Sequence, residues 1–458
     1  MTYSIETDLI AGLPAGWGHR RLKQVAEVVP SNVDKHSVEG QTAVRLCNYV
    51  DTYKNERITS SIEFMPATAT AGQIERLSLK KGDMTITKDS ESPWDIAVPA
   101  YVAEDIEGLV CGYHLSKISP AAGVMDGGYL SWALRSHPVN VQFALSAQGI
   151  TRYGLSSSGL ADGVVPMPPL REQIAIASYL DAETARIDGL IAEKQQLASL
   201  LSELRASIMG DAVQQGLRPD AEVDQTGVPW LGSVPVHWRV VRLKHLLDTI
   251  EQGWSPQCDG RQAEEHEWGV LKAGACNGGV FRPEEHKALQ SGMVGDASIE
   301  VRPGDVLMSR ASGSLDLVGS VAYVRNVRPG LMLSDKIFRL RLDQAQETSP
   351  EWLAMVFNTP TQRRQIASCV GGAEGLARNI TSAAIRELWL AVPPPDEQQA
   401  IVEHVSVRLE RVEALSEAVT REIVLLQELR SATITDAVLR RIDVRAHMKT
   451  DRAREAAA

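Results

Sequence analysis

The residues of this chain that could do chemistry form no catalytic or metal-binding signature. No G-x-x-x-x-G-K-[ST] phosphate loop, G-x-S-x-G or H-E-x-x-H motif occurs, and the Asn-Pro-Pro or Asp-Pro-Pro aromatic motif of amino-methyltransferases is missing. Pro219-Asp220, followed by Glu222 and Asp224, is spaced like part of a nuclease metal site, but the expected lysine does not follow. Because this stretch lies among turn-forming residues, we interpret it as a solvated acidic loop. We therefore expect neither a catalytic nor a metal site.

The histidines and cysteines are also too widely spread to form a ligand set. The ten histidines are scattered, and each suits the surface or the core better than a metal site. The cysteines form no C-x-x-C pair, which fits reduced thiols in the cytoplasm. Residues 1–13 lack the apolar segment of a signal peptide, and no run of 18 apolar residues occurs, so we expect a cytoplasmic protein without a membrane span. The five cysteines are Cys47, Cys111, Cys258, Cys276 and Cys369.

Nearly half of the net charge of −11 is carried by one short part of the chain. Residues 14–160 hold 14 Lys and Arg against 15 Asp and Glu, and residues 234–391 hold 18 of each. Residues 169–232 hold 5 basic against 10 acidic side chains. The two nearly neutral segments can each present a local basic face, although a neutral domain gains little attraction for phosphate by itself. If these segments bind DNA, a partner should supply much of the affinity.

The element that must position the rest of the chain is a long helix that follows Pro168–Gln173 and extends to about Val213. The proline pair ends any helix upstream, and Glu172 places a carboxylate at the positive end of the helix dipole. The same start, Pro-Pro-x-x-Glu-Gln, recurs in Pro393–Gln398 and opens a second long helix. The alternative, two unrelated core helices, gives no reason for a shared start and register.

Apolar residues recur at a heptad step in both helices, interrupted at Lys194. Because the pattern is sustained over more than three heptads without an internal proline, it indicates a two-helix coiled coil. We expect both heptad phases to be buried in the seam between the helices. The expected seam residues are Leu180, Ile187, Leu190, Leu197, Leu201, Leu204, Val412, Leu415, Val419, Leu426 and Leu429.

The stretches before the two helices are copies of one globular domain. Pro, Trp, Arg, Leu and Lys recur at identical spacing in Pro14–Lys23 and Pro235–Lys244, where the tryptophan suits a buried anchor. Lys81–Lys88 and Pro303–Arg310 each have the pattern of a turn that leads into a strand. Short helices are predicted at Tyr129–Leu134 and Trp352–Phe357.

The sequence thus predicts a mixed α/β (α+β) fold with two repeated α/β domains separated by two long helices. Each helix follows its domain, and a parallel pair would require the linker to span about 60 Å. We therefore expect an antiparallel coiled coil with an approximate two-fold axis. The expected boundaries are 1–167 and 234–392 for the domains, 168–215 and 393–443 for the helices, 216–233 for the linker, and 444–458 for a disordered tail.

Together these motifs resemble the DNA-specificity subunit of type I restriction–modification systems. The resemblance rests on the two Pro-Pro-x-x-Glu-Gln starts, the repeated Pro-x-x-Trp…Arg-Leu-Lys motif, the strand Gly304–Arg310 and the linker stretch Gly227–Gly232, and it covers almost the whole chain. The first domain departs from this pattern, because Thr85–Lys88 replaces Leu307–Arg310. Such a difference is expected if the two domains read different DNA sequences.

The resemblance implies two target-recognition domains, each reading one half of a split sequence in double-stranded DNA. The paired helices would act as a spacer that docks two modification subunits, which carry S-adenosylmethionine and methylate adenine. Restriction subunits would join them to cut DNA with ATP and Mg. The chain itself would be non-catalytic and without a cofactor or metal, in line with the missing motifs.

On this resemblance we expect base and phosphate contacts from the loops after the Gly-Asp strands and from the Gly-rich turns before the helices. Arg and Lys suit guanine or phosphate, and Asn suits adenine. For Arg310 an alternative stays open, namely a structural ion pair with Asp316 or Asp335. The candidates are Lys88, Ser92, Thr151 and Arg152 in the first domain and Arg310, Ser312, Ser314, Lys336, Arg378 and Asn379 in the second.

Two functions of other classes stay open at this point. A coiled-coil scaffold could carry globular domains that bind protein, and an enzyme could carry a site without a familiar motif. DNA binding by the chain with and without a modification subunit separates the scaffold from the specificity subunit. Methyl transfer by the chain alone would support the enzyme.

Overall fold

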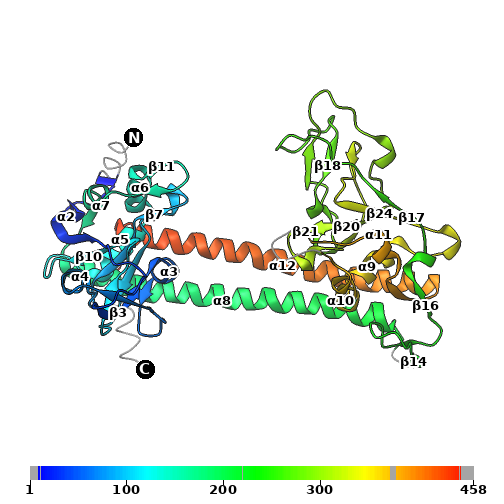
Figure 1. The fold of residues 1–458 in the computed structure, drawn as a ribbon, viewed down its shortest axis with the longest axis horizontal. Helices are drawn as coiled ribbons and strands as arrows, with labels where there is room; N and C mark the ends of the chain where they lie inside the picture. Colours follow the sequence, from blue (N-terminus) through cyan, green and yellow to red (C-terminus); the bar gives the residue numbers. More distant parts are fainter. Residues whose placement is uncertain (1–8, 11, 219, 372–377, 443, 445–458) are drawn as a thin grey trace. The chain divides into compact units, whose positions relative to one another are not determined.

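The computed structural model describes residues 9–10, 12–218, 220–371, 378–442 and 444, which fall into two compact units (Figure 1). Unit 1 holds the chain up to Gln195 and again from Arg421, and unit 2 holds Gln196–Thr420. The long helices α8 (Leu170–Gln215) and α12 (Pro395–Val438) are both divided between the units. Each unit therefore consists of one globular domain, the first part of one long helix and the last part of the other.

The domain of unit 1 is built on a five-stranded sheet in the order β2-β10-β6-β8-β4 and a three-stranded sheet in the order β5-β3-β9. A small sheet, β11-β12-β7, and the pair β1-β13 complete it. The strands are β1 (Gly18–Arg21), β2 (Ala26–Pro30), β3 (Thr42–Cys47), β4 (Arg57–Ile58), β5 (Met65–Ala69), β6 (Met84–Thr87), β7 (Asp89–Ser90), β8 (Pro99–Val102), β9 (Leu109–Cys111), β10 (Leu115–Pro120), β11 (Gln148–Gly149), β12 (Tyr153–Gly154) and β13 (Val164–Met167). The helices are α2 (Leu22–Val25), α3 (Tyr49–Lys54), α4 (Ala71–Leu77), α5 (Gly127–Arg135), α6 (His137–Ser146), α7 (Ser157–Ala161) and the 3-10 turn η1 (Pro93–Asp95).

The domain of unit 2 repeats this plan with sheets β17-β24-β20-β22 and β19-β18-β23 and the pairs β21-β25, β16-β26 and β14-β15. The strands are β14 (Val223–Gln225), β15 (Ser233–Pro235), β16 (Arg239–Arg242), β17 (Leu247–Gln252), β18 (Gly269–Leu271), β19 (His286–Ala288), β20 (Val306–Ser309), β21 (Ala311–Ser312), β22 (Val321–Tyr323), β23 (Leu331–Met332), β24 (Ile337–Leu342), β25 (Arg378–Asn379) and β26 (Trp389–Val392). The helices are α9 (Pro350–Phe357), α10 (Pro360–Ser368), α11 (Ser382–Arg386) and the 3-10 turns η2 (Leu243–His245), η3 (Ala273–Gly279), η4 (Ala297–Ile299), η5 (Leu315–Leu317) and η6 (Gln344–Gln346).

The internal repeat is confirmed in these elements, because the predicted strands and short helices form in both domains. The Gly-Asp motif itself makes a turn. Gly82 and Gly304 adopt the left-handed backbone region at φ +97° and +93°, which a residue with a Cβ rarely enters. The next residue then accepts a hydrogen bond from a backbone N–H three positions back, Lys80 to Asp83 and Arg302 to Asp305, each at 2.9 Å. The motif thus forms the turn that leads into strands β6 and β20.

The Pro-Pro-x-x-Glu-Gln starts tie each long helix to the domain before it. The buried amide of Gln173 donates to the Pro168 carbonyl at 2.9 Å and accepts from the Asp126 backbone N–H at 2.8 Å. Gln398 makes the same pair with the Pro393 carbonyl at 2.9 Å and the Ser349 N–H at 2.7 Å. Since Asp126 and Ser349 are the N-caps of α5 and α9, each glutamine joins two helix starts.

Of the tryptophans in the repeated motif, Trp238 is buried, as predicted, whereas Trp17 is half-buried against the core of unit 1. Trp17 Nε1 donates to a Glu172 carboxylate oxygen at 3.0 Å, and Trp238 Nε1 donates to Glu397 at 3.3 Å. Each indole therefore fixes the glutamate in the first turn of α8 or α12. This pairing explains why the motif at the start of each domain and the motif at the start of each helix recur together.

Within each unit the two long helices run antiparallel, as expected. In unit 1 Asp188 pairs with Arg430 at 2.7 Å and Lys194 pairs with Glu422, so residue numbers rise on α8 while they fall on α12. In unit 2 Arg205 lies 3.8 Å from Glu413. The last turns of α12 enter the apolar core of unit 1 with Ile434, Ala437 and Val438, and Met209, Ala212 and Val213 of α8 enter that of unit 2.

One of the two predicted heptad phases is buried in the seam. The second phase was placed one residue before the positions that are half-buried in the structure. Leu180, Ile187, Leu201, Val412 and Val419 are buried, and Leu426 is half-buried. The prediction of a second buried phase is wrong for Leu197, Leu204, Leu415 and Leu429, which are 40 to 55 % exposed, and Leu190 is only half-buried. The half-buried second phase follows the next residue, at Ile191, Ala198, Ser416 and Ile423. Small side chains at Ala198 and Ser416 allow close helix approach, while the leucines beside them point outward.

The linker holds more structure than expected. The exposed strand β14 pairs with β15, in which Val234 and Pro235 are buried, and Val223 lies opposite Pro235. The acidic residues of this stretch form no metal cluster among the residues that the structure describes. Pro219 and residues 445–458 of the expected disordered tail lie outside the described residues, but its first residue, Val444, is buried in the apolar core of unit 1, so the prediction of disorder is wrong there. Among the described helices, none has a segment long and apolar enough to cross a bilayer.

Candidate nucleic-acid interfaces

In unit 1 the candidate residues gather where the small sheet β11-β12-β7 closes over the end of strand β6. Asp89 and Ser90 of β7 pair with Gly154 and Tyr153 of β12, which brings the hairpin of Thr151 and Arg152 beside the loop after β6. A cavity of about 380 Å³ opens here, lined by Tyr49, Asp89, Ser90, Glu91, Asp95, Thr151 and Arg152. We call this surface, together with Ser92 and His114, the unit 1 face.

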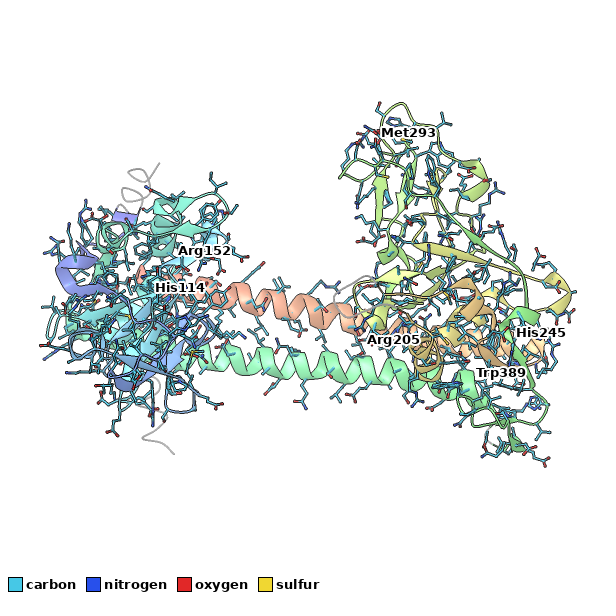
Figure 2. The ribbon with its side chains drawn as sticks, viewed as in Figure 1. His114, Arg152, Arg205, His245, Met293 and Trp389 are labelled. Atoms are coloured by element: carbon cyan, nitrogen blue, oxygen red, sulfur yellow. The ribbon has the colours of Figure 1, made fainter. Side chains whose placement is uncertain are left out.

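Arg152 is the best-placed cation of the unit 1 face. Its Nη2 donates to Asp89 at 2.7 Å, while its side chain stays 61 % exposed. His114 Nδ1 lies 2.7 Å from the other oxygen of the same carboxylate, and Figure 2 shows His114 and Arg152 in the same domain. The short contact requires a proton on Nδ1, so the carboxylate receives two donors.

Two other candidates of unit 1 are engaged within the domain. Lys88 turns inward: its Nζ donates to the Ser31 carbonyl at 3.0 Å and lies 4.8 Å from the centre of the Tyr113 ring. Burial lowers the pKa of this ammonium group. Ser92 caps η1, since its Oγ accepts from the Trp94 N–H at 3.3 Å. Of the four candidates in this domain, Thr151 and Arg152 therefore remain the exposed ones.

In unit 2 the candidates gather in the equivalent place, which we call the unit 2 face. Strand β21 pairs with β25, with Ser312 opposite Arg378 and Ala311 opposite Asn379. The Arg310 backbone N–H donates to the Lys336 carbonyl at 2.7 Å, just as Lys88 N–H donates to His114 at 3.2 Å. The structure therefore brings Arg310, Ser312, Ser314, Lys336, Arg378 and Asn379 to one surface. Residues 372–377 of its Gly-rich turn lie outside the described residues.

Arg310 and Lys336 both contact Asp335. Arg310 Nη1 donates to the Asp335 backbone carbonyl at 3.3 Å and its guanidinium lies 5.7 Å from the centre of the Phe338 ring. Lys336 Nζ lies 3.1 Å from the Asp335 carboxylate. Hydrogen bonds from Ser255 and Lys336 lower the pKa of that carboxyl group. Arg310 thus uses the carbonyl of Asp335 rather than the carboxylate that we considered.

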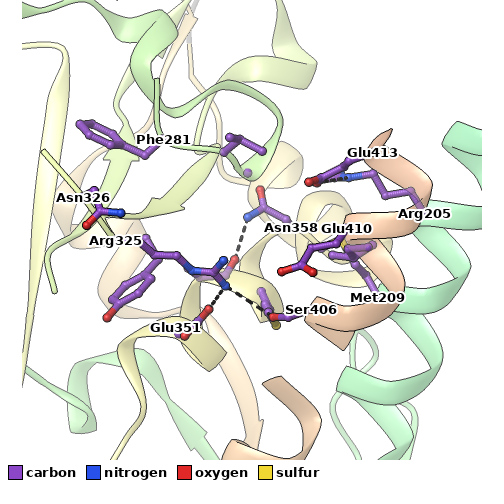
Figure 3. A pocket seen from close by; sticks show the side chains of 16 residues that line it. Arg205, Met209, Phe281, Arg325, Asn326, Glu351, Asn358, Ser406, Glu410 and Glu413 are labelled. Atoms are coloured by element: carbon purple, nitrogen blue, oxygen red, sulfur yellow. Dashed lines mark hydrogen bonds and ion pairs between the residues drawn. The ribbon is translucent and has the colours of Figure 1, made fainter. Parts of the chain in front are cut away.

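A separate cavity of unit 2, about 340 Å³, lies where α8 and α12 meet the domain (Figure 3). Its arginines have partners: Arg205 donates to the Gly278 carbonyl at 2.8 Å, and Arg325 pairs with Glu351. Arg430, the residue equivalent to Arg205, joins Asp188 and Glu56 in unit 1 at 2.7 Å each. This repeated arginine is therefore a junction between helix and domain, which sequence reasoning missed because the partners are distant in the chain.

Comparison with known proteins identifies the relatives of this arrangement. No family model matches the chain. The type I restriction enzyme EcoKI specificity subunit of Escherichia coli strain K12 is 24 % identical over 280 residues, which cover 60 % of this chain and 56 % of that subunit. The EcoEI specificity subunit of Escherichia coli is 28 % identical over 170 residues, which cover 37 % of this chain and 28 % of that subunit. The chain is a relative of the type I specificity subunits.

The fold agrees with this relationship. A chain of a solved type I R-M system, studied for its complex assembly and conformational transition, superimposes with a TM-score of 0.65. That match is 18 % identical and covers 93 % of this chain and 98 % of the other. The fold, two α/β domains with two long helices, is therefore shared with that chain. The chain matches about half the length of the EcoKI subunit.

Proposed function

We propose that this chain is the non-catalytic DNA-specificity subunit of a type I restriction–modification complex, in which each domain reads one half of a bipartite DNA target. The observation that carries the proposal is the pair of equivalent faces. Both lie beyond a Gly-Asp strand and beside a short antiparallel strand pair, yet matched positions differ: Asp89 corresponds to Ala311, and His114 to Lys336. One scaffold with two sets of side chains suits two different half-sites.

The side chains on the two faces suit base edges and phosphates. Arg152 and Arg378 can donate to guanine or phosphate, Asn379 can pair with adenine, and Thr151, Ser312 and Ser314 can contact either. Lys336 and Arg310 add positive charge to the unit 2 face. Because each domain is close to neutral overall, these contacts alone give weak phosphate attraction. The proposal therefore includes partner subunits that contribute to DNA affinity.

The outward leucines of the long helices supply a docking surface for two modification subunits. Leu200 and Leu204 of α8 are 52 % and 47 % exposed in unit 2, and Leu425 and Leu429 of α12 are 61 % and 47 % exposed in unit 1. These pairs occupy equivalent positions of the repeat, so each unit presents one apolar stripe. Contiguous exposed apolar side chains on a helix mark an interaction site. Two equal stripes favour two copies of one partner.

In the proposed complex the chemistry belongs to other subunits. The modification subunits bind S-adenosylmethionine and methylate adenine, and restriction subunits use ATP and Mg to cut DNA. The present chain contributes DNA contacts and docking surfaces. The carboxylates of Asp89 and Asp335 on the two faces lie beside cations, in the pairs Asp89–Arg152 and Asp335–Lys336.

An electrophoretic mobility assay tests this function against a protein-binding scaffold. We expect weak, salt-sensitive DNA binding by the chain alone and tight, sequence-dependent binding when modification subunits are added. Substituting Arg152 and Arg310 by alanine together should remove the sequence dependence while docking persists. Docking of partner subunits without any gain in DNA binding would favour the scaffold.

A further inference from the structure

The Arg152 guanidinium is held in place by the carboxylate of Asp89, which His114 also contacts. Asp89 accepts from Arg152 Nη2 at 2.7 Å through one oxygen and from His114 Nδ1 at 2.7 Å through the other. The Asp89 side chain is 18 % exposed, so it lies largely behind the arginine that it holds. Arg152 Nη2 lies 3.5 Å from His114 Nδ1, and with the histidine proton on Nδ1 the shared carboxylate joins the two groups.

The backbone fixes this arrangement from both sides. Asp89 sits on β7 opposite Gly154 of β12, two residues after Arg152. His114 is fixed because its carbonyl accepts the backbone N–H of Lys88, the residue before Asp89. Both partners of the carboxylate are therefore set by main-chain hydrogen bonds. A guanidinium held this way loses little side-chain entropy when it binds a ligand.

The surroundings favour a base edge over a phosphate as the ligand of Arg152. The cavity beside it is lined by the carboxylates of Asp89, Glu91 and Asp95, which repel a phosphate group. Carboxylates do accept hydrogen bonds from the amino group of cytosine, and an oriented arginine donates two bonds to guanine. The arginine thus matches the acceptors of guanine, and the carboxylates beside it match the amino group of the paired cytosine in the major groove.

We propose that Arg152 reads a guanine in the half-site of the unit 1 domain, and that Asp89 and His114 are positioning residues that hold its guanidinium in the plane that this contact needs. The exposed carboxylate of Glu91 is placed to accept a hydrogen bond from the amino group of the paired cytosine. This assignment rests on the proposed function and names one specified base pair within it. It applies to one domain only, because Ala311 stands where unit 1 has Asp89.

The test uses the full complex with modification subunits and reads the methylated sites across a genome. Asp89→Asn keeps the shape of the side chain and removes the charge, and Arg152→Lys keeps the charge and removes the two-pronged donor. Each should relax the preference for guanine at one position of one half-site by about 5- to 150-fold, the value of a bidentate base contact. The other half-site should be read as before, which shows that the chain is folded.

Rescue and control variants separate positioning from bulk charge. His114→Asn keeps a donor near the Nδ1 position and should preserve guanine preference, whereas His114→Phe should lose part of it. Glu107→Gln removes one exposed carboxylate outside the cavity and should leave the motif intact. The slope of log affinity against log salt should stay unchanged in Arg152→Lys and Asp89→Asn.

Three results would overturn the inference. One is an intact motif in both Arg152→Lys and Asp89→Asn. Another is an equal loss of affinity for all sequences in Arg152→Ala with a salt slope smaller by about one, which marks a phosphate contact. The third is the absence of any chain-dependent bipartite methylation by the unaltered complex, which would refute the proposed function itself.

Discussion

The leucines of α8 allow a sharp test of the seam, because a buried and an exposed leucine stand three residues apart. Leu201 is 6 % exposed and Leu204 is 47 % exposed. Leu201→Ala should lower the free energy of unfolding by about 2–5 kcal/mol, since it removes buried methylenes and leaves a cavity. For a domain of this size that is a fall in melting temperature of roughly 5–15 °C. Leu204→Ala should cost about 1 kcal/mol or less, because half of its surface already meets water.

The same two variants should behave in the opposite way when a partner docks. Leu204→Ala, alone or with Leu200→Ala, should weaken binding of a modification subunit by about five- to tenfold per leucine, the value of about 1 kcal/mol of apolar burial. Leu201→Met, which conserves volume, should change neither property much.

Thermal melts followed by tryptophan fluorescence, and titration with a modification subunit, measure both effects. Equal melting temperatures for Leu201→Ala and Leu204→Ala would refute the seam described here. A Leu204→Ala variant that docks with unchanged affinity would refute the apolar stripe as the docking surface.

Three further predictions concern the elements that hold this arrangement. Gln173→Ala should destabilise unit 1, and Gln398→Ala should destabilise unit 2, by about 2–3 kcal/mol each, because buried backbone groups lose their hydrogen-bond partner. Chemical denaturation measures this change, and an unchanged unfolding midpoint would count against it. Arg430→Ala should lower the free energy of unfolding by about 1 kcal/mol, because the carboxylate partners of Arg430 are half exposed. Arg430→Lys should recover only part of this stability, because a lysine cannot donate two parallel hydrogen bonds as a guanidinium does. Thermal melts of the two variants measure both effects. A four-residue insertion near Gln195 lengthens α8 by about 6 Å and nearly keeps the facing of the seam, so the unread gap in the DNA target should grow by one or two bases, whereas a two-residue insertion should abolish activity. Sequencing of methylated sites tests the insertions, and an unchanged gap in the longer variant would mean that modification subunits place the domains.

The elements of the fold were predictable where local chemistry decides them. Proline pairs mark the starts of α8 and α12, and the Gly-Asp turns mark β6 and β20, because backbone constraints act over a few residues. Because the chain contains two copies of the domain and helix, each of these patterns occurs twice. The short helices α5 and α9 were likewise found within two residues of their true bounds.

The seam shows where such reasoning stops. Positions three and four residues after a buried residue both lie on the same side of a helix, so hydrophobicity alone favoured Leu197 and Leu204. The half-buried position is instead Ala198, whose small side chain permits close contact between helices. The choice depends on the partner helix, which a single heptad pattern does not describe.

The candidate residues lie together in each unit, but several of their contacts within the domain were not predictable from the sequence. Strand β7 pairs with β12 in unit 1 and β21 pairs with β25 in unit 2, so the described candidate residues converge in both units. Lys88 turned inward because the carbonyl of Ser31 lies within reach, and Asp89 and His114 were missed because 25 residues separate them. Contacts of this kind arise from strand pairing, which the sequence of a single chain does not display.

The central claim is that the two domains read two separate halves of one DNA target. Sequencing of methylated adenines in a host that expresses this chain with its modification subunits tests it most directly. The account predicts one motif with two short specified blocks, separated by an unread gap of constant length, that disappears when the chain is deleted. A single uninterrupted motif, or methylation that persists without the chain, would contradict it.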